Sequence, residues 1–163
     1  YARATLVSRI TPMVQDAYER LAGAPTPIEL TYEPEWRQVG LIPALQAART
    51  TDVRRGVSTV GPHRDELSFT INGLPSRTHA SQGEQRTLAL ALRLAAHQLV
   101  TERTGSAPVL VLDDVLSELD EKRATALLEH IPPGQVIITS ASELPPAAQA
   151  DRILRIEGGR VVE

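Results

Sequence analysis

The apolar positions in the first third of the chain predict a helix, a strand and a second helix. Apolar residues at helical spacing predict a helix over residues 2–22, which Pro12 would kink or split. Residues 28–32 predict a short strand because they combine aliphatic, β-branched and aromatic side chains. A second helix is predicted over residues 36–49, followed by a polar connection over residues 50–58.

The pattern changes after Gly61, where strands and helices are predicted to alternate. Apolar residues at every second position over residues 67–71, followed by Asn72-Gly73, predict a hairpin. The later elements are a helix over about residues 82–102, a strand over 109–112, a helix over about 121–130, a strand over 136–138 and a last hairpin around Gly158-Gly159. Two buried strands joined through a helix usually pair in parallel by a right-handed crossover. The predicted fold class is therefore α/β, with a parallel sheet and flanking helices.

Composition narrows the classes of function without choosing one. The 163 residues suit one domain, or one domain with part of another, and 42% apolar residues suffice for a buried core. No apolar run approaches the roughly 18 residues of a membrane span. The lack of cysteine excludes disulfides, thiolate metal sites and cysteine nucleophiles. These features predict a cytoplasmic protein without membrane contact.

The charges give no sign of a general affinity for nucleic acid. There are 17 Lys and Arg residues against 20 Asp and Glu, a net charge of -3, so any contact with DNA must be local. Arg54, Arg55 and Arg64 are candidate contacts, although such arginines are more often solvated or ion-paired. The sequence opens at Tyr1 without a methionine or a leader pattern, so we expect it to be part of a longer chain.

The first candidate site is the start of the long predicted helix. It reads Ser81-Gln82-Gly83-Glu84-Gln85, with Ser81 and Glu84 in the register of a capping box. Gly83 weakens a helix but lets another molecule approach its backbone, and the free amides of a helix start attract phosphate. Taken alone, the motif favours an ordinary helix cap over a phosphate site.

The second candidate site is the pair Asp113 and Asp114, which directly follows the apolar strand predicted over residues 109–112. Ligands bind at the C-terminal end of a parallel sheet. There, Asp113 suits a hard cation and Asp114 suits orienting or deprotonating water. The alternative is that the two carboxylates only end the strand and begin a turn.

The third candidate is Ser117 and Asp120, which have cap spacing before a predicted helix; by themselves they favour a plain helix start. Together, however, the three motifs resemble in order and spacing the C-terminal lobe of an ATP-binding cassette (ABC) ATPase head, a P-loop NTPase fold. The resemblance implies that the signature segment (residues 81–85) contacts ATP held by an opposite subunit. It also implies that Asp113 holds Mg²⁺, that Asp114 polarises the attacking water, and that Asp120 of the D-loop (residues 117–120) bridges the subunits.

Within the ABC ATPases, the sequence resembles the RecF family. The resemblance is carried by residues 61–67, 80–92 and 111–120, and covers about residues 52–140. It implies that residues 1–52 are the end of a mainly helical arm domain, and that residues 53–163 are the C-terminal lobe of the head. Glu66 and Glu84 are mild departures, because the family usually has Asp at the first position and often Gln at the second.

The resemblance also implies a role and partners. It implies a weak ATPase that binds ATP and Mg²⁺, dimerises on ATP, binds DNA at gaps or single-strand/double-strand junctions, and assists RecA loading with RecR in recombinational repair. The phosphate-binding loop of such proteins, G-x-x-x-x-G-K-[ST], does not occur here, since Lys122 lacks the preceding glycines. This chain alone is therefore not expected to bind ATP in the ordinary way.

Other features leave the chemistry open. Thr139 and Ser140 stand where many ABC ATPases carry a switch histidine, so hydrolysis assisted by histidine there is in doubt. His63 is the nearest substitute, with Arg64 beside it, although a histidine next to proline is more often structural. Two alternatives remain: another head of the chromosome and repair ATPases, or a binding module that keeps the sheet without hydrolysis.

Overall fold

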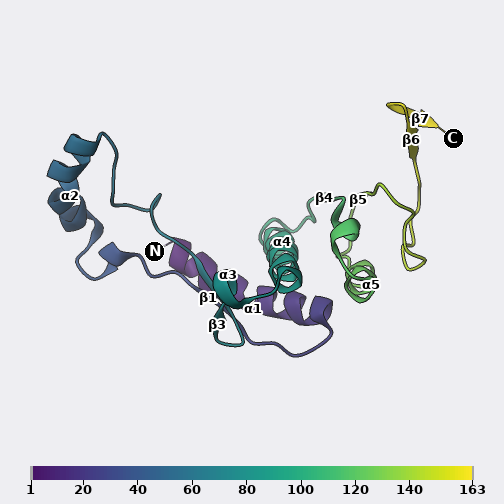
Figure 1. Ribbon diagram of the computed structural model, residues 1–163, viewed down its shortest axis with the longest axis horizontal. Coiled ribbons are helices and arrows are strands. Elements are labelled where there is room, and N and C mark those ends of the chain that lie inside the picture. The colour runs from purple at the N-terminus through teal and green to yellow at the C-terminus, as the bar shows by residue number, and fades with distance from the viewer. Residues whose placement is uncertain (1, 163) are drawn as a thin grey trace.

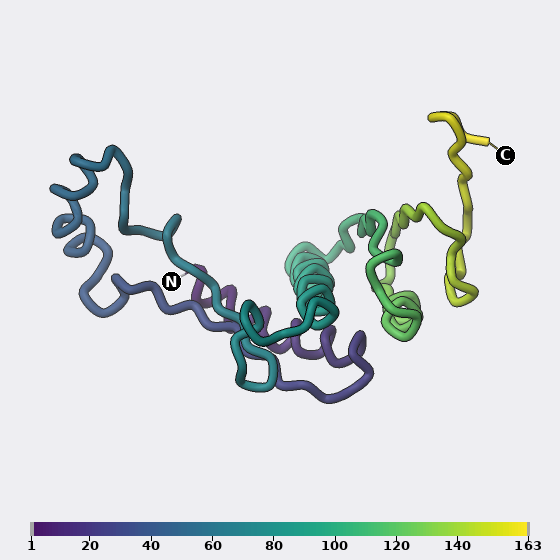
Figure 2. The backbone as a smooth tube through the Cα atoms, viewed as in Figure 1, coloured from purple at the N-terminus to yellow at the C-terminus, as the bar shows by residue number. Residues whose placement is uncertain are grey.

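The computed structural model describes residues 2–162, so Tyr1 and Glu163 lie outside the described residues. The chain is elongated, with α2 (Leu41–Arg55) at one end and a terminal hairpin at the other (Figure 1). This hairpin pairs β6 (Arg155–Glu157) with β7 (Arg160–Val162) in antiparallel fashion, as the sequence predicts. The backbone tube in Figure 2 shows that α2 and the terminal hairpin protrude from a central part of the molecule. This central part contains the core.

The centre of the fold is the packing of α1 (Ala2–Ala22) against α4 (Gln82–Thr104). α1 buries one face at helical spacing, and α4 contributes small buried residues that let the helices approach; these residues are Ile10, Val14, Tyr18 and Leu21 of α1 and Ala91 and Ala95 of α4. α1 runs through Pro12 without a break, so the prediction of a split helix is wrong. Pro12 lies on the exposed face, and the buried face on both sides of it holds the helix together.

An antiparallel sheet joins two distant parts of the chain. β1 (Ile28–Thr31) pairs with β2 (Ser68–Ile71), which pairs with β3 (Leu74–Pro75). The predicted hairpin is confirmed, because Asn72 and Gly73 both adopt the positive φ angles of a tight β-turn. A short helix, α3 (Ser76–His79), follows and has no counterpart among the predicted elements.

The second helix begins and ends later than predicted. A 3-10 turn, η1 (Glu35–Arg37), comes first, and α2 begins only after Gly40, whose φ of 92° cannot belong to a helix. Residues 50–55 are helical instead of forming a connection, because no chain-breaking residue occurs until Gly56, which caps the helix at a φ of 67°. No side chain of α2 is buried within the described part of the chain, so the apolar pattern there carried little information.

The predicted parallel strand pair is confirmed. β4 (Leu110–Asp113) pairs in parallel with β5 (Val136–Thr139), and the connection contains η2 (Val115–Glu118) and α5 (Glu121–Glu129). One face of β4 is buried. On the other face Val111 is 59% exposed, and Ile137 of β5 is 45% exposed. Parallel sheets are normally covered on both faces, so the described residues cover only half of this one.

Two further observations bear on the organisation of the chain. The division at residue 52 stays a prediction, and the packing of α1 on α4 and the pairing of β1 with β2 both cross it. Within residues 2–162, none of the helices combines the length and the apolar character needed to cross a bilayer.

We expect Leu127→Ala to lower the free energy of unfolding by about 2–5 kcal/mol, because the Leu127 side chain of α5 is fully buried and its truncation leaves a cavity. The matched control is Leu154→Ala at a site 54% exposed, which should change the free energy by about 0.5 kcal/mol or less. Urea unfolding followed by circular dichroism measures both. Equal losses in the two variants would contradict this account of the core.

Candidate functional site

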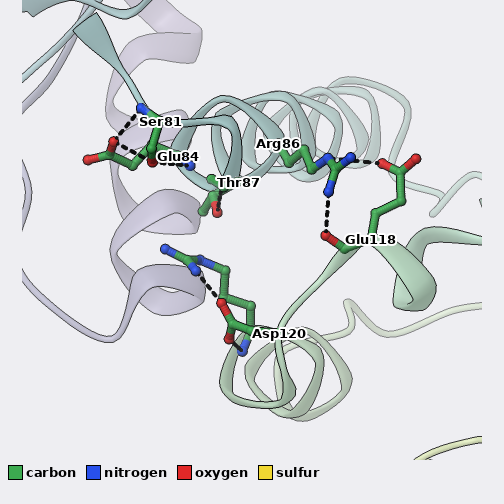
Figure 3. A network of polar contacts seen from close by, with 8 residues as sticks. Ser81, Glu84, Arg86, Thr87, Glu118 and Asp120 are labelled. Carbon is green, nitrogen blue, oxygen red and sulfur yellow. Dashed lines mark hydrogen bonds and ion pairs between the residues drawn. The ribbon is translucent and has the colours of Figure 1, made fainter.

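The signature segment forms a complete capping box at the start of α4, as the sequence predicts (Figure 3). The Ser81 hydroxyl accepts from the Glu84 backbone N–H at 3.3 Å and donates to Glu84 Oε2 at 2.7 Å, and the Ser81 backbone N–H donates to the same oxygen at 2.8 Å. These donors hold the pKa of Glu84 below its usual range, with the Ser81 hydroxyl as the largest cause. Hydrogen bonds between Ser81 and Glu84 therefore order the segment in the absence of a ligand.

The amide of Gln85 fixes the chain that leads into the signature segment. Gln85 Nε2 donates to the carbonyls of Ser76 and Ala80, at 3.2 and 3.1 Å. Gly83 faces no obstacle within the described chain, because a Cβ there would meet Arg123 Nη1 at 3.7 Å, an ordinary contact. Its φ is not positive either. Neither packing nor backbone conformation within residues 2–162 thus requires glycine at this position.

Asp113 and Asp114 lie exposed at the C-terminal end of β4, and the neighbouring strand β5 holds both. The Thr139 hydroxyl donates to Asp113 Oδ1 and accepts from the Asp114 backbone N–H at 3.0 Å. That N–H also donates to the Thr139 carbonyl at 3.2 Å. Asp114 adopts a left-handed conformation with φ 49°, which turns the chain sharply out of the strand. Thr139 thus has a positioning role that sequence reasoning missed; the parallel register pairs it with Asp113.

The carboxylates at this strand end fit a cation that is also bound by phosphates. Among residues 2–162, no three His, Cys, Asp or Glu side chains gather into a metal site. Mg²⁺ commonly takes one or two protein carboxylates together with substrate phosphates and water. Asp113, with Oδ1 engaged by Thr139, can offer its second oxygen to such an ion. The donor set therefore suits nucleotide-bound Mg²⁺ better than an all-protein cage.

The D-loop connects the strand end to α5. Ser117 donates its hydroxyl to the Asp114 carbonyl at 2.8 Å. Asp120 caps α5 by accepting from the Arg123 backbone N–H at 2.9 Å. This amide, followed by the Arg123 side chain, holds the pKa of Asp120 below its usual range. Asp120 takes a helix-cap position as the sequence predicts, whereas Ser117 lies inside η2 and caps no helix.

Two arginines join the D-loop to the signature segment, and sequence reasoning missed both. Arg86 of α4 donates to the Glu118 carbonyl at 3.2 Å, and its Nε lies 3.6 Å from Glu118 Oε2 (Figure 3). Arg123 of α5 pairs through Nη1 with Asp120 and packs beside Gly83. A contact between residues 32 positions apart has no periodic signal in the sequence. The structure therefore brings residues 81–85 and 117–120 together.

The remaining candidates divide between two places. Ser140 directly follows β5 and shares a 3.3 Å contact with the Ser142 hydroxyl. His63 Nε2 and Arg64 Nε both lie against the Ser58 carbonyl, at 3.3 and 3.0 Å. The segment between α2 and β2 that carries them lies on the far side of α4 from β4 (Figure 1). Within this chain, His63 is therefore not brought to the aspartate pair.

Asp65 organises the segment that carries His63 and Arg64. Its carboxylate accepts from the Tyr32 hydroxyl at 2.5 Å and from Trp36 Nε1 at 2.8 Å. The hydrogen bond to Asp65 is the largest cause that raises the pKa of Tyr32. A groove of about 860 Å³ runs beside this segment and is lined in part by Trp36, Arg64 and Asp65. These contacts explain the conformation of the segment without a catalytic role for His63 or Arg64.

Comparison with known proteins gives consistent relatives. No protein-family model matches the chain. DNA replication and repair protein RecF of Rippkaea orientalis is 37% identical over 172 residues, which covers 98% of this chain and 45% of that protein. The protein of the same name from Streptomyces avermitilis is 42% identical over 151 residues, or 85% of this chain and 40% of that protein. The chain thus spans less than half the length of these curated relatives.

Solved structures agree with these relatives. A structure of the recombination mediator protein RecF-ATPrS in the RecFOR pathway superposes with a TM-score of 0.79 at 28% identity, covering 98% of this chain and 45% of that one. An Smc head bound to the C-winged helix domain of ScpA gives a TM-score of 0.59 at 18% identity, which indicates a shared fold alone. These structures are ABC ATPase heads, and this chain shares their α/β fold, including the parallel strand pair.

We expect Ser81→Ala to destabilise the protein by about 0.5–2 kcal/mol at neutral pH, the usual cost of losing a helix cap. The same change should raise the pKa of Glu84 toward its usual value, because the largest donor to the carboxylate is lost. Titration of the Glu84 side-chain carbon by NMR measures the pKa, and urea unfolding measures the stability.

The sign of the pH dependence follows from the lowered pKa of Glu84. Stabilisation from the ionised carboxylate is complete above its unfolded pKa and is lost as the pH falls through the lowered folded value. The deficit of Ser81→Ala should therefore shrink in acid. Ser106→Ala, at the opposite end of α4, is the matched control without an effect. A deficit that is constant with pH would count against the capping box.

Proposed function

Because this chain belongs to the RecF family, we propose that it is the C-terminal lobe of an ABC ATPase head that acts in DNA repair. The lobe would work together with the rest of a longer protein. The matched part makes up 45% of the length of the Rippkaea orientalis relative. The observation that carries the proposal is the joint position of the signature segment, the aspartate pair and the D-loop around the start of α4 and the ends of β4 and β5. Each of these motifs alone fits plain structure.

The signature segment is proposed to contact the terminal phosphate of ATP held by a second subunit. Nothing within residues 2–162 requires glycine at position 83, and a glycine in the first turn lets a ligand approach the free amides closely. The Ser81 hydroxyl and these amides would then distinguish ATP from ADP, because only ATP carries the terminal phosphate. A contact that exists only before hydrolysis makes dimerisation depend on the nucleotide.

Asp113 and Asp114 are proposed to serve the nucleotide of their own subunit. Asp113 holds Mg²⁺, an ion that neutralises charge on the phosphates. Asp114 orients and polarises the attacking water, and Asp120 bridges the two subunits. Thr139 supports this assignment, because it fixes one oxygen of Asp113 and the backbone of Asp114. His63 and Arg64 are kept as candidates only if the rest of the protein, or a second subunit, brings them to the site.

The other half of the site is proposed to lie in the part of the natural protein that this chain does not span. The bare face of the β4–β5 pair, with Val111 and Ile137, supports this because it needs a covering element. That part would supply the phosphate-binding loop. We also propose that residues 1–52 mark the end of the arm domain and residues 53–163 the lobe of the head, although α1 packs on α4.

The proposed role is recombinational repair of single-strand gaps. The protein would dimerise on ATP, bind DNA at gaps or single-strand/double-strand junctions, and assist RecA loading with RecR. A solved relative is described as a recombination mediator in the RecFOR pathway, which supports this role. We also propose that the protein acts in the cytoplasm, because its relatives named as DNA replication and repair proteins are bacterial. The likeness to an Smc head favours a second candidate, a chromosome ATPase, only at the level of the fold.

We expect Ser81→Arg to abolish ATP-dependent dimerisation of the full-length protein, because a large cation fills the space that the partner's phosphate needs. Sedimentation velocity with and without ATP and Mg²⁺ measures the dimer. Ser106→Arg makes the same substitution at the other end of α4 and should leave the dimer intact. Undiminished dimerisation in Ser81→Arg would remove the signature segment from the interface.

We expect Asp114→Asn to lower the ATP turnover of the full-length protein by about 10²–10⁴-fold, the usual contribution of a positioned acid or base. Asparagine also tolerates the left-handed conformation of this position, so the backbone should be kept. Asp151→Asn, at an exposed carboxylate of the C-terminal region, is the control. Turnover that survives in Asp114→Asn would favour a binding module without hydrolysis.

A further inference from the structure

Arg86 and Arg123 hold the same two segments together from opposite helices. Arg86 projects from α4 and contacts both the backbone and the carboxylate of Glu118 in the D-loop. Arg123 projects from α5, pairs with Asp120, and has its Nη1 3.7 Å from the point that a Cβ on Gly83 would occupy. Figure 3 shows Arg86 and Glu118 next to each other, with Asp120 below the start of α4. Two separate tethers therefore connect segments that are about 35 residues apart in sequence.

The guanidinium of Arg123 pairs with Asp120 and lies near the first turn of α4, beside Gly83. Its positive charge contributes to the lowered pKa of Asp120 in the D-loop, and it also helps to lower the pKa of Glu84 in the signature segment. Burial in the core is the largest cause that raises the pKa of Tyr18 of α1; the charge of Glu84 adds to the rise and that of Arg123 opposes it. Arg123 Nε is buried and has no hydrogen-bond partner among residues 2–162. The Arg123 side chain is 28% exposed and is thus largely buried where the D-loop meets the start of α4.

These ion pairs contribute little to folding. The Arg86 and Glu118 side chains are 48% and 61% exposed, and Asp120 is 50% exposed. Ion pairs in such positions are largely screened by solvent and usually add little to stability. Both tethers nevertheless end on segments that are proposed to meet the partner subunit. Their effect is therefore on the relative position of the two segments.

We propose that Arg86 and Arg123 are positioning residues that fix the D-loop against the signature segment, so that a partner subunit with bound ATP engages both segments together. The inference rests on the proposed function, because the partner's nucleotide gives the two segments their common target. Neither arginine needs to touch ATP for this role. It differs from the role of Ser81 and Gly83, whose groups would face the phosphate themselves.

A charge reversal tests the first tether in the full-length protein. Arg86→Glu places two carboxylates opposite each other, and we expect the dissociation constant of the ATP dimer to rise at least about tenfold. Glu118→Arg alone should weaken the dimer in the same direction. The double variant Arg86→Glu/Glu118→Arg restores opposite charges and should return to within about threefold of wild type. Failure of the double variant to recover would overturn the tether and indicate a direct contact of Arg86 with the partner.

A charge-conserving change tests the second tether. Arg123→Ala should weaken the ATP dimer by about tenfold, whereas Arg123→Lys keeps a cation beside Asp120 and should lose about threefold or less. Sedimentation velocity with ATP and Mg²⁺ measures both variants. Equal losses in the alanine and lysine variants would overturn the role of the charge. Arg93→Ala, at an exposed arginine of α4 with no ion pair in the described residues, is the control and should behave as wild type.

Two additional measurements separate positioning from folding and from nucleotide binding. The thermal midpoint of each variant should match that of Arg93→Ala, and binding of a fluorescent ATP analogue to the monomer should be unchanged. A dimerisation defect that follows a drop in thermal midpoint would overturn the proposal in favour of a structural role. If the wild-type protein itself fails to dimerise on ATP, the proposed function fails. If wild type dimerises and Arg86→Glu and Arg123→Ala dimerise equally well, only this inference fails.

Discussion

The packing of α1 against α4 is the interaction on which the rest of the structure depends. The buried faces of these helices supply the middle of the core, and α5 packs against α1 as well. β1 follows α1 directly and pairs with β2, so the antiparallel sheet is attached to the same body. The start of α4 is therefore fixed by the buried residues of its first four turns. A ligand-binding segment gains precision when a rigid element carries it.

The groups of the candidate site are attached to this rigid body through short segments. These segments lie at the ends of α4, β4 and β5, and each segment is held by hydrogen bonds to its own element or to the next one. The capping box orders the signature segment, Thr139 orders the aspartate pair, Arg86 connects the D-loop to α4, and Arg123 pairs with Asp120 beside Gly83. The aspartate pair and Ser81 are exposed, so their side chains are accessible to a ligand.

Local patterns predicted most of the fold, and contacts between distant residues account for what they missed. The hairpin at Asn72-Gly73, the long helix and the parallel strand pair each have a signal within a few residues, and all three are confirmed. α2 was misplaced because it has no buried face, so its limits depend on Gly40 and Gly56 instead of apolar spacing. The pairing of β1 with β2 had no local signal at all. The same holds in the site: the helix caps were readable from sequence, whereas the contacts of Arg86, Arg123 and Thr139 depend on how elements pack.

The bare face of the β4–β5 pair has a consequence for how the protein behaves in solution. A parallel sheet with exposed Val111 and Ile137 is an aggregation hazard until another segment covers it. The solubility of this part of the chain is therefore expected to depend on the segment that covers the sheet.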